Sequence, residues 1–136
     1  AAVLKKLELN VQERVILYQS NYFKDILPPE NDHFEKVIRT DAMPDRDQSL
    51  ALMRKKMIDE NDFCAAIFIG GMEGVEDEYN LFKKAHPDCP VFPIASSGAA
   101  SKILYIKNQF KDKKLLTDFC YLPLFDELFE GILSGK

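Results

Sequence analysis

The residues best suited to chemistry lie in a glycine turn and in the acidic segment that follows it. Gly70 and Gly71 end an apolar run, and Gly74 precedes Glu78 by four residues. Glycines let a ligand approach the main chain closely, and the N–H groups at the start of a helix attract anions. A carboxylate there could bind ribose hydroxyls, or stabilise positive charge that develops on a ribose during bond cleavage. The spacing points to a nucleotide, although for the glycine pair alone a tight turn without ligand is at least as good a reading.

A second turn of small residues, Ser96-Ser97-Gly98, could hold the phosphate of such a ligand. Four acidic residues crowd the glycine turn and the first turn of the following helix: Glu73, Glu76, Asp77 and Glu78. They make this segment a poor environment for an anion. We therefore expect phosphate to meet Ser96, Ser97 and the N–H groups of residues 98–101. Capping of the following helix explains these small residues equally well. Ser20, in a turn at 19–21, is expected at the same edge, where the carboxyl ends of parallel strands meet.

Arg54 and His86 are two further candidates. Arg54 lies at mid-height on the helix before the apolar run, and its long side chain could extend to the glycine turn, although a solvent-facing arginine is the usual outcome. His86 and Cys89 have an H-x-x-C spacing, but no second pair completes a set of four ligands. We therefore expect no metal and no cofactor.

Alternating strands and helices must position these residues. The apolar runs predict strands at 14–18, 36–40, 63–69, 90–94 and 119–121. The helical periods predict helices at 1–9, at 47–60 with Asp47 as N-cap, at 75–85, at 99–110 and from Pro123 to residue 133. Residues 22–46 are otherwise read mainly as a surface excursion. This alternation predicts an α/β fold, a Rossmann-like three-layer α/β/α arrangement with a mainly parallel sheet.

The bulk composition fits a single globular domain over residues 1–136. The chain has 46% hydrophobic and 29% charged residues and a net charge of −4, which argues against a nucleic-acid or anionic-membrane surface. No apolar run approaches the ~20 residues of a membrane span. The three cysteines adjoin apolar runs: Cys64, Cys89 and Cys120. We expect them to be reduced thiols in the core of a cytoplasmic protein. The chain opens without Met inside a helix-like stretch, so we expect a piece of a longer domain or protein.

The glycine pattern resembles the LOG family, the cytokinin-activating phosphoribohydrolases once labelled lysine decarboxylases. The LOG pattern is R-K, then P-G-G-x-G-T-x-x-E, and here Arg54-Lys55 precede the glycine pair at the expected interval. The segment FIGGMEGVEDEY followed by PIASSGAA is more similar to the related SLOG domains, over about residues 14–106. Three departures alter the turn that should position a reacting ribose: Ile69 replaces proline, one residue is inserted before Gly74, and Val75 replaces threonine.

The SLOG resemblance implies a sensor or regulatory domain that binds a nucleotide-derived ligand, such as a cyclic or ADP-ribose-like signal. Gly70, Gly71 and Gly74 would admit the ligand, the 96–98 turn would hold phosphate, and Glu78 would meet ribose. The alternative is a LOG-like phosphoribohydrolase that cleaves the N-ribosyl bond of a nucleoside monophosphate, with Glu78 and Arg54 as catalytic residues. A structural or assembly module that has lost its ligand is a third reading.

The C-terminal segment 119–133 carries more apolar side chains than one narrow helix face can bury. Such a surface needs a cover, and the resemblance implies pairing through helices. We therefore predict a homodimer or larger oligomer that uses this helix or the 99–110 helix. The resemblance also allows an effector domain fused outside this chain.

Overall fold

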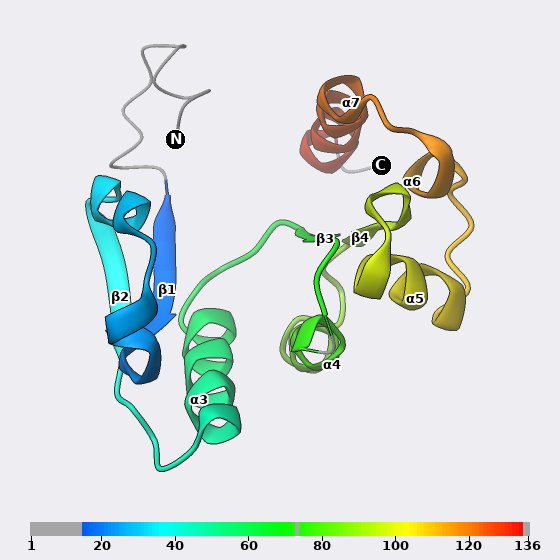
Figure 1. The fold of residues 1–136 in the computed structure, drawn as a ribbon. Coiled ribbons are helices and arrows are strands. Elements are labelled where there is room, and N and C mark those ends of the chain that lie inside the picture. The colour runs from blue at the N-terminus through cyan, green and yellow to red at the C-terminus, as the bar shows by residue number, and fades with distance from the viewer. Residues whose placement is uncertain (1–14, 73, 135–136) are drawn as a thin grey trace. The chain divides into compact units, whose positions relative to one another are not determined.

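A computed structural model describes residues 15–72 and 74–134, which form two compact units divided after Glu60 (Figure 1). Each unit combines helices with one pair of parallel strands. The predicted α/β class is therefore confirmed, as two small parallel sheets. The single domain and the three-layer Rossmann-like arrangement stay predictions, and the helix predicted at 1–9 lies outside the described residues.

The first unit is built on β1 (Ile16–Ser20) and β2 (Lys36–Thr40), which pair so that Ser20 lies opposite Thr40. Two 3-10 helices connect the strands, η1 (Asn21–Ile26) and η2 (Pro29–His33). The next helix, α3 (Arg46–Asp59), contacts both strands. The strand predicted at 36–40 is confirmed. The prediction of a turn at 19–21 is wrong, because Gln19 and Ser20 are the last residues of β1 and Asn21 begins η1.

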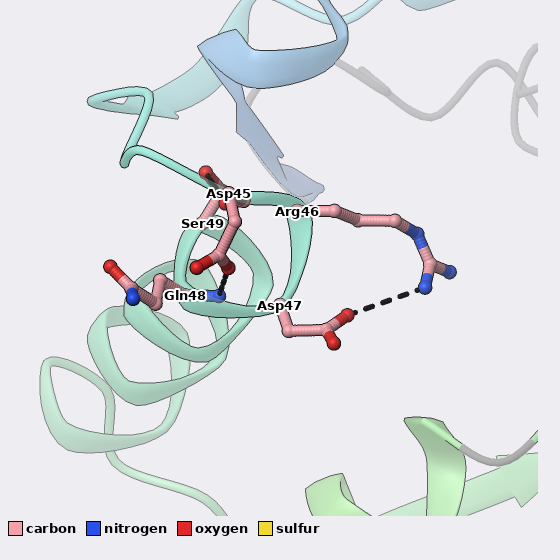
Figure 2. Close-up of polar contacts among 5 residues, drawn as sticks. All are labelled: Asp45, Arg46, Asp47, Gln48 and Ser49. Carbon is pink, nitrogen blue, oxygen red and sulfur yellow. Dashed lines mark hydrogen bonds and ion pairs between the residues drawn. The ribbon is translucent and has the colours of Figure 1, made fainter.

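The start of α3 is fixed by Asp45 and not by Asp47 as predicted (Figure 2). The Asp45 carboxylate accepts a hydrogen bond from the Gln48 N–H at 2.8 Å, which satisfies one of the free N–H groups of the first turn. Ser49, fully buried, accepts from the Met43 N–H at 2.9 Å and so ties the preceding loop to the helix. Asp47 lies within the first turn.

The described residues of the second unit form one parallel strand pair and four α-helices. In chain order its elements are β3 (Ala66–Ile69), α4 (Gly74–Ala85), β4 (Val91–Ile94), the 3-10 helix η3 (Ala95–Ser97), α5 (Ala99–Lys107), α6 (Lys114–Thr117) and α7 (Tyr121–Leu133). β3 pairs with β4 in register from Ala66 opposite Val91. The run predicted as a strand at 63–69 is shortened because pairing starts at Pro90, which has no N–H to extend the ladder.

Two other predictions for this unit are corrected. The strand predicted at 119–121 is wrong: an Asp118 carboxylate oxygen accepts from the Cys120 N–H at 2.8 Å, and α7 begins at Tyr121. The helix predicted to reach residue 110 ends at Lys107, because Gln109 takes a positive φ of 55° and leaves the helical path. The start and end of α4 agree with the prediction within one residue.

The core of the second unit joins the end of β4 to the three helices that follow it. Its buried members are Ile94, Ala95, Tyr105, Leu115, Leu124 and Leu128. This packing supports the segment between β4 and α5. Outside the core, Cys64 and Cys120 are exposed, so the prediction of core thiols is wrong for these two. Among the described helices, none combines the length and the apolar character that crossing a bilayer requires.

Candidate ligand-binding site

The glycine turn after β3 is hydrogen-bonded to the segment after β4. The Gly70 N–H donates to the Ser97 hydroxyl at 2.7 Å. In the opposite direction, the Ser101 N–H donates to the Gly70 carbonyl at 3.1 Å, and the Ala100 N–H donates to the Gly71 carbonyl at 3.3 Å. Because β3 and β4 are parallel, both turns lie at the carboxyl edge of the pair, where α/β proteins bind ligands. The structure therefore brings together two of the segments that the sequence singles out.

Two serines hold this arrangement in place. Ser97 accepts from Gly70 and donates its own hydroxyl proton to the Ile94 carbonyl at 2.5 Å. Ser101, fully buried, donates its hydroxyl to the Gly70 carbonyl at 3.1 Å. Sequence reasoning missed the role of Ser101; the only signal was its place in a run of small residues at the start of a helix.

The same bonds use several N–H groups that were predicted to meet phosphate. The N–H groups of Ala100 and Ser101 point to the glycine carbonyls, and the Gly98 N–H donates to the Ala95 carbonyl at 3.0 Å. The start of α5 is therefore capped by the glycine turn. The predicted phosphate contact of residues 96–98 stays a prediction.

Three glycines have backbone angles that other residues resist. Gly70 and Gly71 have φ values of 55° and 83°, and Gly98 combines φ 81° with ψ −162°, a region occupied almost only by glycine. At Gly71 an added Cβ would lie 2.2 Å from Cγ2 of Val75, whereas nothing lies within 4 Å of one at Gly70 or Gly98. The open space beside these two positions leaves the main chain approachable.

Ser96, in η3, has a buried hydroxyl without a hydrogen-bond partner in the described part of the chain. A buried hydroxyl without a partner costs ~1–3 kcal/mol, so structures seldom leave one unsatisfied. This serine therefore differs from its neighbour Ser97, whose hydroxyl makes two internal bonds.

The acidic start of α4 is partly neutralised by α5. Glu76 forms an ion pair with Lys107 at 2.6 Å, which links the two helices. Glu78 is half-buried on α4, four residues after Gly74, which begins the helix. Nearby, burial raises the pKa of the Tyr79 hydroxyl, and the Tyr79 ring meets that of Phe68 edge-on at 5.9 Å. Glu73 lies outside the described residues.

Ser20 and Arg54 belong to the first unit, whereas the other predicted site residues belong to the second. Ser20 is almost fully buried, and its hydroxyl accepts from the Tyr22 N–H at 3.2 Å, so it caps η1. Arg54 is half-exposed on α3. Their predicted roles in ligand binding and catalysis stay predictions.

A cavity of 490 Å³ lies elsewhere in the second unit, at the starts of β3 and β4 and beside α7. It is lined by Cys64, Pro90, Phe92, Glu127, Leu128, Gly131 and Ile132. None of the predicted site residues lines it. His86 is part of an aromatic cluster, with its ring 5.2 Å from that of Phe63 and 5.0 Å from that of Phe82. Over residues 15–72 and 74–134, no group of three His, Cys, Asp or Glu residues could hold a metal ion.

Comparison with known families identifies the chain. The family model described as the SLOG cluster3 family matches residues 1–129 of the 136. No curated protein and no solved structure matches. The match includes the glycine turn and the 96–98 turn, and it confirms the SLOG resemblance that these two segments carry in the sequence. The chain therefore belongs to the SLOG cluster3 family.

Proposed function

We propose that this chain is a sensor or regulatory domain that binds a nucleotide-derived ligand at the edge formed by residues 70–74 and 96–98. Membership of the SLOG cluster3 family supports a nucleotide-related function. The observation that carries the proposal is the reciprocal hydrogen bonding of the two turns at the carboxyl edge of a parallel strand pair. Such bonding gives a site whose backbone is ordered before the ligand arrives.

Within this site the two serines have different roles. Ser97 holds Gly70 and belongs to the framework. Ser96 has a buried hydroxyl free of partners among the described residues, and a polar group of the ligand would satisfy it. We therefore assign the phosphate, or a ribose hydroxyl next to it, to Ser96 and the open side of Gly98.

The matching experiment is calorimetric titration with nucleotides, cyclic nucleotides and ADP-ribose. Ser96→Ala should weaken binding about tenfold, as expected for the loss of ~1–1.5 kcal/mol from one hydrogen bond. Ser134→Ala is the matched control, because Ser134 is exposed after the end of α7 and bonds only locally, to the Gly131 carbonyl. Absence of binding by every ligand near millimolar concentration would sink the proposal, as would equal effects of the two variants.

The hydrolase alternative depends on Glu78. This residue is half-buried on the helix that begins at Gly74, so it could stabilise charge on a ribose held by the glycine turn. The test is release of free base from nucleoside monophosphates, with loss of release in Glu78→Gln. Arg54→Ala should lower the same rate if Arg54 orients the substrate. Binding without turnover would favour the sensor.

Three further assignments complete the proposal. We infer a three-layer Rossmann-like arrangement, supported by parallel pairing in both units. We infer a cytoplasmic location, supported by three free cysteines. We infer a homo-oligomer that pairs through α7, where Leu122, Phe129 and Leu133 are exposed by 74%, 48% and 87%.

A further inference from the structure

Cys64 and Cys89 occupy matching positions before the two strands of the second unit. β3 and β4 are in register from Ala66 opposite Val91, and each cysteine lies two residues before its strand. The Ala66 N–H donates to the Pro90 carbonyl at 3.0 Å, so the two chains are still adjacent one residue before the ladder. Neighbouring strands lie ~4.8 Å apart, which is within the ~4.4–6.8 Å Cα separation of disulfides.

A hydrogen bond places the Cys89 sulfur close to Cys64. The Cys89 Sγ–H donates to the Phe63 carbonyl oxygen at 3.3 Å. That oxygen lies ~2.8 Å from the Cα of the next residue, Cys64, because the two atoms flank one peptide bond. The Cys89 sulfur is therefore no more than about 6 Å from the Cys64 Cα, and a rotation of the two side chains can join the sulfurs.

The two thiols differ in environment. Cys64 is exposed and lines the 490 Å³ cavity, so a small reagent can reach it. Cys89 is half-buried, and burial together with the nearby Cys64 raises the pKa of its thiol, while Lys83 acts in the opposite direction. The exposed thiol is the one that reacts first with an external reagent, and the half-buried thiol is placed to resolve the product.

We propose that Cys64 and Cys89 are a redox-active thiol pair that a low-molecular-weight disulfide, such as glutathione disulfide, converts to an intramolecular disulfide. The Cys64 thiolate attacks one sulfur of the reagent, the reagent S–S bond breaks, and one glutathione thiolate leaves. The Cys89 thiolate then attacks the Cys64 sulfur and displaces the second glutathione thiolate. The two cysteine protons end on the two glutathione thiols, so the protein loses two electrons and the reagent gains them.

The new bond would enclose β3, the glycine turn and α4 in one covalent ring from residue 64 to residue 89. Such a ring restricts the unfolded chain, so the oxidised protein should melt at a higher temperature than the reduced protein. This inference is independent of any ligand at the glycine turn, because neither thiol belongs to that site.

The test is peptide mapping of the full chain after incubation with glutathione disulfide and alkylation of the remaining thiols. The expected result is a peptide pair joined through Cys64 and Cys89, with Cys120 alkylated or glutathionylated. Cys64→Ser should lose the joined pair, whereas Cys120→Ser should keep it. A lasting glutathione adduct on Cys64 with Cys89 still alkylated, or a bridge that includes Cys120, would overturn the proposal.

Thermal unfolding gives a second readout beside peptide mapping. In Cys120→Ser, oxidation by glutathione disulfide should raise the melting temperature, and a thiol reductant should return it to the starting value. The double variant Cys64→Ser/Cys120→Ser should show no such shift. A melting temperature that oxidation leaves unchanged in Cys120→Ser, when the joined peptide pair is absent, refutes the thiol pair.

Discussion

Replacing Gly71 with alanine should destabilise the second unit, for two separable reasons. The φ of 83° lies in the left-handed region, which costs an L-residue ~1–2 kcal/mol. The added Cβ would also lie 2.2 Å from Cγ2 of Val75, and moving Val75 off its rotamer costs ~0.5–1.5 kcal/mol. Alanine has less conformational freedom than glycine in the unfolded chain, which offsets ~0.4–1 kcal/mol of this loss of stability. The free energy of unfolding should therefore fall by about 2 kcal/mol.

Urea unfolding followed by circular dichroism measures this loss, and two further variants identify its origin. Val75→Ala removes Cγ2 and leaves the Val75 Cβ at 3.4 Å from the new methyl group, an ordinary contact. The double variant Gly71→Ala/Val75→Ala should therefore be more stable than the sum of the single losses predicts, by ~0.5–1.5 kcal/mol. Gly131→Ala is the control, because nothing lies within 4 Å of its added Cβ in α7, and it should stabilise by ~0.5–1 kcal/mol.

The reasoning fails if the midpoint of unfolding lies at the same urea concentration for Gly71→Ala as for the wild type. It also fails in part if the double variant shows no coupling, because the loss would then come from the backbone angle alone. A loss in Gly131→Ala as large as that in Gly71→Ala would show that any added methyl group is harmful here, whatever the local geometry.

Three other predictions follow from the described contacts. Ser97→Ala leaves the Gly70 N–H without its acceptor and should lower the free energy of unfolding by ~1–3 kcal/mol in urea titration; a loss below half of that contradicts the bond. The hydrogen bond to Glu127 raises the pKa of Lys114, so its stabilising effect is present below pH 10.5 and is lost as pH rises through the folded-state pKa. The melting temperatures of the wild type and Glu127→Gln should accordingly converge at high pH, and a constant difference would contradict this. Leu133→Lys should convert the predicted dimer to a monomer in light scattering; a wild-type monomer at micromolar concentration would refute the interface.

Several element boundaries could be predicted from glycine or proline at the ends of the elements. Gly74 and Gly98 mark the starts of α4 and α5, and Pro87 follows the end of α4, so these boundaries were predicted within one residue. The meeting of the two glycine turns could also be predicted, because parallel strands bring their carboxyl ends to one edge. Local backbone chemistry was sufficient in each case.

The rest depends on contacts that have no periodic signal. The bond from the Gly70 N–H to Ser97 spans 27 positions, and the bond from Ser101 to the same glycine spans 31. The aromatic segment before α7 has the composition of a strand, but Asp118 bonds the Cys120 N–H and the chain turns into a helix. Here a local bond between a side chain and the backbone overrides the strand preference of a short segment.

The first turn of α5 is hydrogen-bonded to the glycine turn, so a movement of this helix would displace the proposed site. A hydrogen bond tolerates only a few tenths of an ångström, so an axial shift of α5 by 1.5 Å, about one residue of rise, would pull the turn out of position. α5 exposes Ile103 and Ile106 by 52% and 62% to contacts from outside. If a molecule that contacts these side chains displaces α5, that molecule and a ligand at the proposed site would each alter the affinity of the other by an equal free energy.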